Sequence, residues 1–268
     1  MSQPWMLETP APQADTRIPY GELTHQFGDL RLPRGEGPHP VVVMVHGGFW
    51  RARYDLEHVG HLCEDLRRRG YATWSLEYRR VGHPDGGWTG TFEDVARGTD
   101  YLRTLAMRYP LNLERVVVMG HSAGGHLALW LAGRGRLKPG QPLYTEKPFE
   151  PRGAVSLAGV VDLERAFELR LGDGIVESLL GGTPARVPER YKIASPAALL
   201  PLGVKQVLVH GAEDTIVPLL VSTEYHARAT KLGDNVKLVS LPGAAHFEVI
   251  DPRAKEWPRV VEAIASLL

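Results

Sequence analysis

Short apolar runs alternate with amphipathic stretches along most of the chain. Runs such as Val41–Val45 and Val116–Met119 are too short for buried helices and are typical of strands covered on both faces. Apolar residues recur with helical spacing over 56–69, 92–109, 221–232 and 257–268. The predicted strands cover 18–20, 23–30, 41–45, 71–78, 116–119, 154–161, 206–210 and 236–241. Because strands and helices alternate, the pattern predicts an α/β fold, a mostly parallel sheet with helices on both faces.

The length of 268 residues fits one α/β domain spanning 1–268. Residues 1–15 are rich in Pro, Ala and Gln, and they are predicted to form a flexible N-terminal arm. The stretch 162–200 contains short amphipathic pieces interrupted by Gly181, Gly182, Pro184 and other glycines and prolines. An irregular stretch of this length inside a compact domain is typical of a cap or lid, so we expect it to shape the substrate pocket.

Charge and composition limit the partners that we expect. The chain has 31 basic and 31 acidic residues and no block of either sign, so neither nucleic acid nor an anionic membrane is expected as a partner. Cys63 is the single cysteine, which excludes an intrachain disulfide and fits a reducing compartment. The N-terminus lacks the features of a signal peptide, and no run reaches the roughly 18 apolar residues of a membrane span. We therefore expect a cytoplasmic protein.

The apolar run 116–119 leads into Gly120-His121-Ser122-Ala123-Gly124, which fits the G-x-S-x-G pattern of a nucleophile elbow. A chance match is the alternative, because the chain holds 29 glycines, but the preceding strand and following helix supply the context that the motif requires. In such a turn, a Cβ at either flanking position would clash, which explains both glycines. The Ser122 hydroxyl would stand clear of the sheet as a nucleophile.

A serine nucleophile needs a base and a group that orients the base. Asp214 follows the strand predicted at 206–210, and His246 follows the strand predicted at 236–241. The order Ser122, Asp214, His246 is the order of an α/β-hydrolase triad, with His246 as general acid and base and Asp214 as its orienting carboxylate. Alternatives to these two residues are Glu213 and Asp251, and the remaining histidines, which are interpreted as core, surface or pocket residues.

A second motif, His46-Gly47-Gly48-Phe49-Trp50, follows the strand predicted at 41–45. Acyl transfer places negative charge on the former carbonyl oxygen, and fixed backbone N–H groups stabilise it. We expect the N–H groups of Gly48, Phe49 and Ala123 to form this oxyanion hole, with Gly47 as a further candidate. The alternative is a plain strand-to-helix turn. His46 is interpreted as a group that orders the loop.

Several aromatic side chains near these motifs are candidates for a substrate pocket. We expect pocket positions for Trp50, Tyr54, His121 and Phe247, although ordinary core or loop packing explains such residues equally well. Asp214, His246, Ser122 and the loop after position 45 all follow predicted strands. Because ligands of such sheets bind at the carboxyl ends of the strands, these groups should meet at one edge.

Together, these motifs resemble those of the α/β-hydrolase superfamily, over nearly the whole chain from about Gly28 to Leu268. His46-Gly47-Gly48-Phe49-Trp50 is similar to the H-G-G-x-W motif of kynurenine formamidases (arylformamidases) and their esterase relatives. The elbow is also similar to that of acetyl-esterase and lipase enzymes. Phe49 stands where the hormone-sensitive-lipase-like pattern has a third glycine. The resemblance implies an eight-stranded sheet with a small cap, the triad named above, and hydrolysis without a metal or cofactor.

The sequence therefore predicts a serine hydrolase that cleaves a small carboxylic ester through an acyl-enzyme, with an aryl formamide as the close alternative. A peptidase of the prolyl-oligopeptidase type shares the residue order, but such enzymes usually carry a large gating domain before the catalytic core. A non-catalytic module that binds a small molecule is a third alternative, although here every role in the triad has a candidate. The physiological substrate and the oligomeric state do not follow from the sequence.

Overall fold

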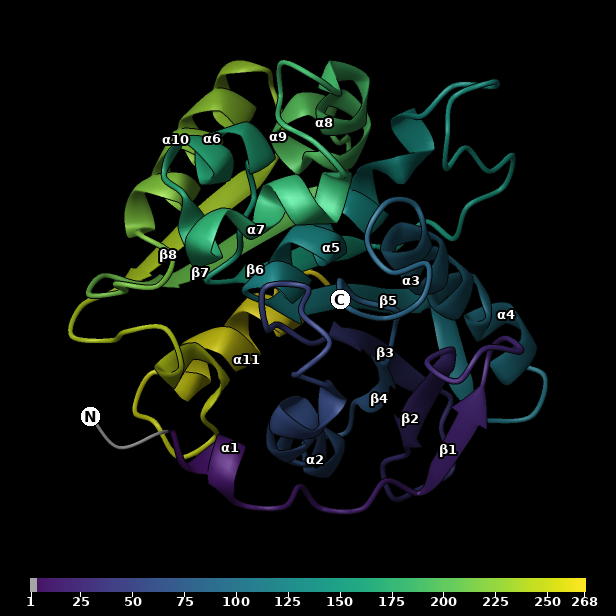
Figure 1. Ribbon diagram of the computed structural model, residues 1–268. Helices are drawn as coiled ribbons and strands as arrows, with labels where there is room; N and C mark the ends of the chain where they lie inside the picture. Colours follow the sequence, from purple (N-terminus) through teal and green to yellow (C-terminus); the bar gives the residue numbers. More distant parts are fainter. Residues whose placement is uncertain (1–3) are drawn as a thin grey trace.

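The computed structural model describes residues 4–268 and contains one eight-stranded sheet with the order β1-β2-β4-β3-β5-β6-β7-β8 (Figure 1). The first two pairings, β1 with β2 and β2 with β4, are antiparallel, and all others are parallel. The strands are β1 (Thr16–Pro19), β2 (Phe27–Arg31), β3 (His39–Val45), β4 (Ala72–Leu76), β5 (Leu111–His121), β6 (Gly153–Leu157), β7 (Lys205–Gly211) and β8 (Val236–Leu241). This architecture confirms the predicted fold class.

Helices cover both faces of the sheet because side chains of the central strands alternate between two cores. Val41, Val43 and Val45 of β3 belong to the larger core, and Val42 and Met44 to the smaller one. The larger core holds α3 (Gly90–Asp100), α4 (Leu102–Leu105), α5 (Ala123–Gly133) and α10 (Leu219–Lys231). The smaller core holds η1 (Leu56–Val59), α2 (Gly60–Arg68) and α11 (Trp257–Ala265), on the opposite side of the sheet in Figure 1. Two further 3-10 helices are short, η2 (Arg134–Arg136) and η3 (Glu248–Ile250).

The stretch 162–200 folds between β6 and β7 into four short helices. These are α6 (Leu163–Glu168), α7 (Leu171–Leu180), α8 (Pro188–Ala194) and α9 (Pro196–Leu199). Pro188 and Pro196 stand at the first turns of their helices, where a missing N–H costs nothing. The glycines and prolines therefore separate helices here, and the stretch is more regular than its composition predicts.

Two predicted strands are too long by several residues, and the first of them, predicted over 23–30, begins only at Phe27. The sequence predicts a strand over 154–161, whereas β6 ends at Leu157. Ala158 has a φ of 47°, and a Cβ on Gly159 would lie 2.0 Å from Ser156 Oγ, so the chain turns back sharply at this point. The apolar residues that continue the run, Val160 and Val161, are buried after the strand ends, and Val160 N–H donates to Ser122 O over 3.3 Å.

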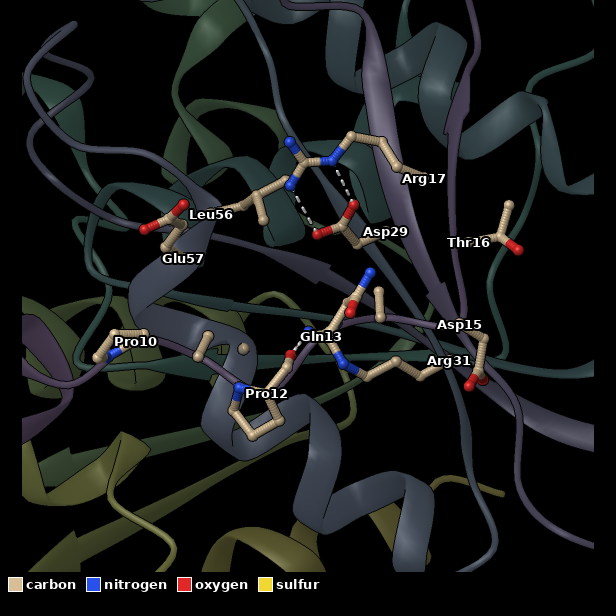
Figure 2. A pocket seen from close by; sticks show the side chains of 13 residues that line it. Pro10, Pro12, Gln13, Asp15, Thr16, Arg17, Asp29, Arg31, Leu56 and Glu57 are labelled. Carbon is tan, nitrogen blue, oxygen red and sulfur yellow. Dashed lines mark hydrogen bonds and ion pairs between the residues drawn. The ribbon is translucent and has the colours of Figure 1, made fainter.

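Residues 4–15 lie against the domain in the structure, and residues 1–3 of the predicted arm are outside the described part. The segment begins with α1 (Trp5–Glu8), whose Met6 is buried in the smaller core. Figure 2 shows residues 10–17 beside a cavity of about 370 Å³ that Asp29 and Arg31 also line. Arg31 Nη2 donates to Pro12 O over 2.8 Å, which ties the segment to β2. Within residues 4–268, no helix is both long and apolar enough to cross a membrane.

Candidate active site

Ser122 lies at the sharp turn between β5 and α5, with φ 55° and ψ −119°. This backbone conformation is rare for a residue with a side chain, and strain of this kind marks functional turns. A Cβ on Gly120 would lie 2.0 Å from Gly124 O, and one on Gly124 would lie 2.0 Å from Val45 O at the end of β3. The two glycines therefore allow strand, turn and helix to close around Ser122, which is the geometry of a nucleophile elbow.

Asp214 and His246 come together after β7 and β8. His246 Nδ1 lies 2.6 Å from Asp214 Oδ2. The other carboxylate oxygen, Oδ1, accepts from the backbone N–H groups of Ile216 at 2.8 Å and Val217 at 2.9 Å. Because the ionised carboxylate only accepts, Nδ1 of His246 carries the hydrogen, which leaves Nε2 as the free ring nitrogen.

Burial alone would raise the pKa of Asp214, but hydrogen bonds from His210 and His246 outweigh it and hold the pKa well below its ordinary value. His210 is completely buried, and its Nε2 lies 2.8 Å from Val217 O and 3.3 Å from Asp214 Oδ2. From the sequence, His210 is one of the histidines interpreted as core residues. In the structure it is a buried, hydrogen-bonded core residue beside the Asp214 carboxylate. Asp214 is therefore held as an anion.

Ser122 and His246 line the same small cavity, of about 100 Å³. Among the residues that the structure describes, Asp214 is hydrogen-bonded to His246, whereas no hydrogen bond joins Ser122 Oγ to His246. Such contacts are often long in free enzymes and shorten when substrate binds. Of the predicted triad, the structure thus shows the hydrogen bond between Asp214 and His246, and it places Ser122 in the same cavity as His246.

Gly47, Gly48 and Phe49 follow β3 and approach the serine from the other side. A Cβ on Gly47 would lie 3.1 Å from Ser122 Cβ, and Gly48 and Phe49 line the cavity with φ values of 104° and 51°. In the described part of the chain, the N–H groups of Gly48 and Phe49 find no acceptor. Ala123 is the first residue of α5, where helical N–H groups have no partner in the helix. These three N–H groups are therefore the candidates for the predicted oxyanion hole.

His46 orders this loop from below. Its Nδ1 lies 2.8 Å from Gly47 O, an acceptor, so Nδ1 carries the hydrogen. Its Nε2 lies 3.1 Å from Arg80 Nη1 and 3.2 Å from Glu77 Oε1, and Nη1 binds that carboxylate oxygen at 2.6 Å. Tyr78 stacks on the His46 ring and donates to His46 O over 2.8 Å. The loop is therefore fixed before any substrate binds, as expected from the sequence for His46.

The cavity walls differ from the predicted pocket at several positions. Tyr54, His121 and Phe247 line it, but Trp50 does not. Trp50 is fully buried in the larger core, where its Nε1 donates to His126 Nδ1 over 3.2 Å. Sequence reasoning missed three further lining residues, which are Leu7, His58 and Ile216. Leu7 lies in the predicted arm, and no local pattern places it or His58 at the site.

Two wall histidines are held neutral. Burial, with a smaller contribution from His46, lowers the pKa of His58 to about 3. Burial and the neighbouring His246 also lower the pKa of His121 well below its ordinary value. His121 Nε2 donates to His246 O over 2.9 Å, so this ring supports the loop that carries His246. At neutral pH these two side chains add no positive charge beside His246.

The 162–200 stretch does not supply any residue that lines the cavity. It touches the site indirectly, because a Cβ on Gly172 would lie 2.7 Å from the Phe49 ring and Arg51 Nη2 donates to Gly172 O over 2.5 Å. The expectation that this stretch is a cap or lid that shapes the pocket stays a prediction. Its contact is with the back of the loop that carries Gly48 and Phe49.

An eight-stranded, mainly parallel sheet, with a serine elbow after β5 and the pair Asp214–His246 after β7 and β8, defines an α/β hydrolase. Residues 29–228 match the family described as BD-FAE. The chain belongs to the BD-FAE family.

Curated relatives of the chain are named as esterases. A probable isoprenylcysteine alpha-carbonyl methylesterase of Arabidopsis thaliana is 26% identical, over 96% of this chain and 56% of its own length. The esterase LipC of Mycobacterium tuberculosis is 26% identical, over 88% of this chain and 60% of its own length. The chain thus spans little more than half the length of these relatives.

Solved esterase structures share the fold. A truncated carbohydrate esterase from gut microbiota has a TM-score of 0.78 at 19% identity, with 95% of this chain and 97% of that chain covered. A thermophilic esterase of Thermogutta terrifontis has a TM-score of 0.75 at 20% identity, with 96% and 92% covered. The fold class predicted from the sequence, that of the α/β hydrolases, is confirmed. The comparisons do not single out the kynurenine formamidase branch.

Proposed function

We propose that this protein hydrolyses a small carboxylic ester through an acyl-enzyme formed on Ser122. The observation that carries the proposal is the cavity in which Ser122, the Asp214-bound His246 and the backbone of Gly48 and Phe49 meet. A nucleophile, an oriented base and fixed oxyanion donors are the three parts that acyl transfer needs. The names of the relatives support ester hydrolysis as the reaction class.

In the first half-reaction, Ser122 Oγ attacks the ester carbonyl carbon and its proton passes to His246 Nε2. The carbonyl oxygen becomes negative and accepts from the N–H groups of Gly48, Phe49 and Ala123, each worth roughly 3–4 kcal/mol in the transition state. The bond from carbon to the alcohol oxygen then breaks, and His246 gives its proton to that oxygen. Asp214 stabilises the imidazolium throughout.

In the second half-reaction, water replaces the alcohol. His246 Nε2 takes a proton from the water as its oxygen attacks the acyl-enzyme carbon. The bond from carbon to Ser122 Oγ breaks, the proton returns to the serine, and a carboxylic acid leaves. No step needs an oxidant or a metal ion. The cavity of about 100 Å³ is well below the roughly 300–1,000 Å³ of pockets that hold drug-sized ligands, which supports a short acyl group.

The test is Ser122→Ala assayed with p-nitrophenyl acetate, together with labelling by a fluorophosphonate probe. We expect the variant to lose both turnover and labelling, because it lacks the hydroxyl that forms the proposed acyl-enzyme. Ser266→Ala is the matched control, since Ser266 is an exposed serine on the C-terminal side of α11. Unchanged turnover by Ser122→Ala would contradict the serine mechanism. Lack of labelling of the unaltered protein would favour a binding module.

An aryl formamide is the second candidate substrate, supported by the likeness of His46-Gly47-Gly48-Phe49-Trp50 to the H-G-G-x-W motif. The chemistry is the same, with a formyl group on Ser122 and an arylamine as the group that His246 protonates. Parallel assays with N-formylkynurenine and p-nitrophenyl acetate separate the two. A formamidase should show the higher kcat/KM with N-formylkynurenine, whereas an esterase should turn over the acetate and leave the formamide unchanged.

A further inference from the structure

The short helix α1 contributes Leu7 to the lining of the active-site cavity and is fixed at both ends. Trp5 Nε1 donates to Asp251 Oδ2 over 2.8 Å, and the guanidinium of Arg253 lies 3.4 Å from the centroid of the Trp5 ring. Met6 is only 3% exposed, and Thr9 O lies 3.1 Å from His61 Nε2. Between these anchors, Leu7 faces the cavity that holds Ser122. The helix is therefore a wall of the site.

A second hollow lies on the other side of this wall. It has a volume of about 480 Å³, and we name it the α1 groove. Its apolar lining comes from Trp5, Met6 and Pro4 on one side and Ile216, Ala245 and Phe247 on the other. Ile216 is 37% exposed although it is a large apolar residue, so the groove presents an apolar surface that the described chain leaves open.

The α1 groove and the small cavity share three residues, Ile216, His246 and Phe247. Ser122, Gly48 and Phe49 line only the small cavity, so the ester carbonyl has to lie there. In the proposed reaction, the alcohol oxygen must reach His246, because His246 protonates it. A group that leaves the carbonyl past His246 enters the α1 groove, whereas a group that stays with the carbonyl remains on the side of the small cavity that Leu7 lines.

We propose that the α1 groove binds the alcohol part of the substrate, and that the preferred substrates are short-acyl esters of large apolar primary alcohols. This proposal rests on the proposed function and adds to it the direction in which the ester lies. Apolar burial in the groove favours an aromatic or branched alcohol, while Leu7 and the cavity volume restrict the acyl group to about the size of acetyl.

Two isomeric esters test the direction. 2-Naphthylmethyl acetate carries its bulk on the alcohol, and methyl 2-naphthylacetate has the same atoms with the bulk on the acyl group. We expect kcat/KM to be at least tenfold higher for the naphthylmethyl acetate, because the α1 groove would bury the naphthyl ring of the alcohol. The reverse preference, as the activity in the name of the Arabidopsis relative would give, overturns the proposal.

Substitutions in the two walls locate the effect. Ile216→Ala keeps the backbone N–H that Asp214 Oδ1 accepts, and Trp5→Ala removes the wall on the other side. Each should reduce the ratio of kcat/KM between 2-naphthylmethyl acetate and ethyl acetate by about fivefold, mainly through KM. Leu220→Ala is the control, because Leu220 is an exposed apolar residue of α10 outside both hollows. An unchanged ratio in both wall variants contradicts the proposal.

Leu7→Ala tests the acyl side separately. Removing this side chain should extend the acyl range, so that the ratio of kcat/KM for ethyl hexanoate over ethyl acetate rises by about tenfold. Glu8→Ala, an exposed neighbour on the same helix, is the matched control and should leave the ratio unchanged. If Leu7→Ala leaves it unchanged too, Leu7 does not limit the acyl group. If the unaltered protein cleaves none of these esters, the proposed function itself fails, which is a different outcome from a flat or reversed ratio.

Discussion

At the residue scale, the site combines side chains that are fixed in one protonation state. Asp214 is held as a carboxylate by His210, His246 and two backbone N–H groups. His58 and His121 are held neutral by burial. In the proposed reaction, His246 is the group that exchanges a proton with the substrate, as a general acid and base does.

Replacing each carboxylate in turn should show whether Asp214 or its neighbour in the sequence, Glu213, orients His246. In Asp214→Asn, the amide oxygen can still accept from the backbone N–H groups. The amide carries no negative charge, and its NH₂ group cannot accept from His246 Nδ1. We expect kcat to fall roughly 1,000- to 10,000-fold with little change in KM. Steady-state kinetics with p-nitrophenyl acetate measure both. Glu213→Gln should retain activity, because Glu213 is exposed; a loss equal to that of Asp214→Asn would reassign the carboxylate.

The buried His58 makes stability depend on pH. Its pKa is about 3 in the folded protein and near 6.5 when unfolded, so between these values only the unfolded chain binds the proton. The free energy of unfolding should therefore fall by about 1.4 kcal/mol for each pH unit below 6.5 from this residue alone. Urea unfolding from pH 6.5 to pH 4 should show a shallower pH dependence for His58→Gln than for the control His226→Gln. Equal slopes for the two variants would exclude His58 as the source.

At the element scale, the sheet strands could be predicted because buried strands are continuous apolar runs whose identity does not depend on distant residues. The elbow and the loop after β3 could be predicted because glycine is required where backbones approach each other. The walls of the cavity could not, since Leu7 and His58 reach it only through tertiary packing. Trp50 was misplaced for the same reason: an aromatic side chain beside a motif fits a core as well as a pocket.

The elbow makes a prediction at this scale, because β3, β5 and α5 meet at Gly124. Gly124→Ala would place a Cβ 2.0 Å from Val45 O, and backbone on both sides prevents relief. We expect the free energy of unfolding to fall by about 3 kcal/mol, measured by urea denaturation. Gly135→Ala is the control, since the nearest atom to its Cβ would be 4.0 Å away. If Gly124→Ala has the same free energy of unfolding as the unaltered protein, the turn can widen enough to accept a Cβ.

At the scale of the whole molecule, two apolar cores share one sheet. Neighbouring residues of β3 and β5 belong to different cores, so loss of either core exposes the strands that support the other. The sequence predicts a single domain over 1–268 on length alone, and this shared sheet is a physical reason for cooperative unfolding.

Differential scanning calorimetry tests that expectation. One transition is expected, with calorimetric and van't Hoff enthalpies that agree. Met6→Ala, which opens the smaller core beneath α1, should lower the midpoint of that transition without splitting it. Two separate transitions in the unaltered protein would show that the cores unfold as independent units.

The position of α1 also bears on how substrate specificity can change during evolution. Four residues outside the sheet supply one side of both hollows, while every reacting group sits on loops that follow β3, β5, β7 and β8. Mutations at positions 5 and 7 can therefore alter which esters bind without displacing the residues proposed to cleave them. Natural variation in this short helix would therefore allow members of one family to diverge in substrate specificity while their catalytic loops stay the same.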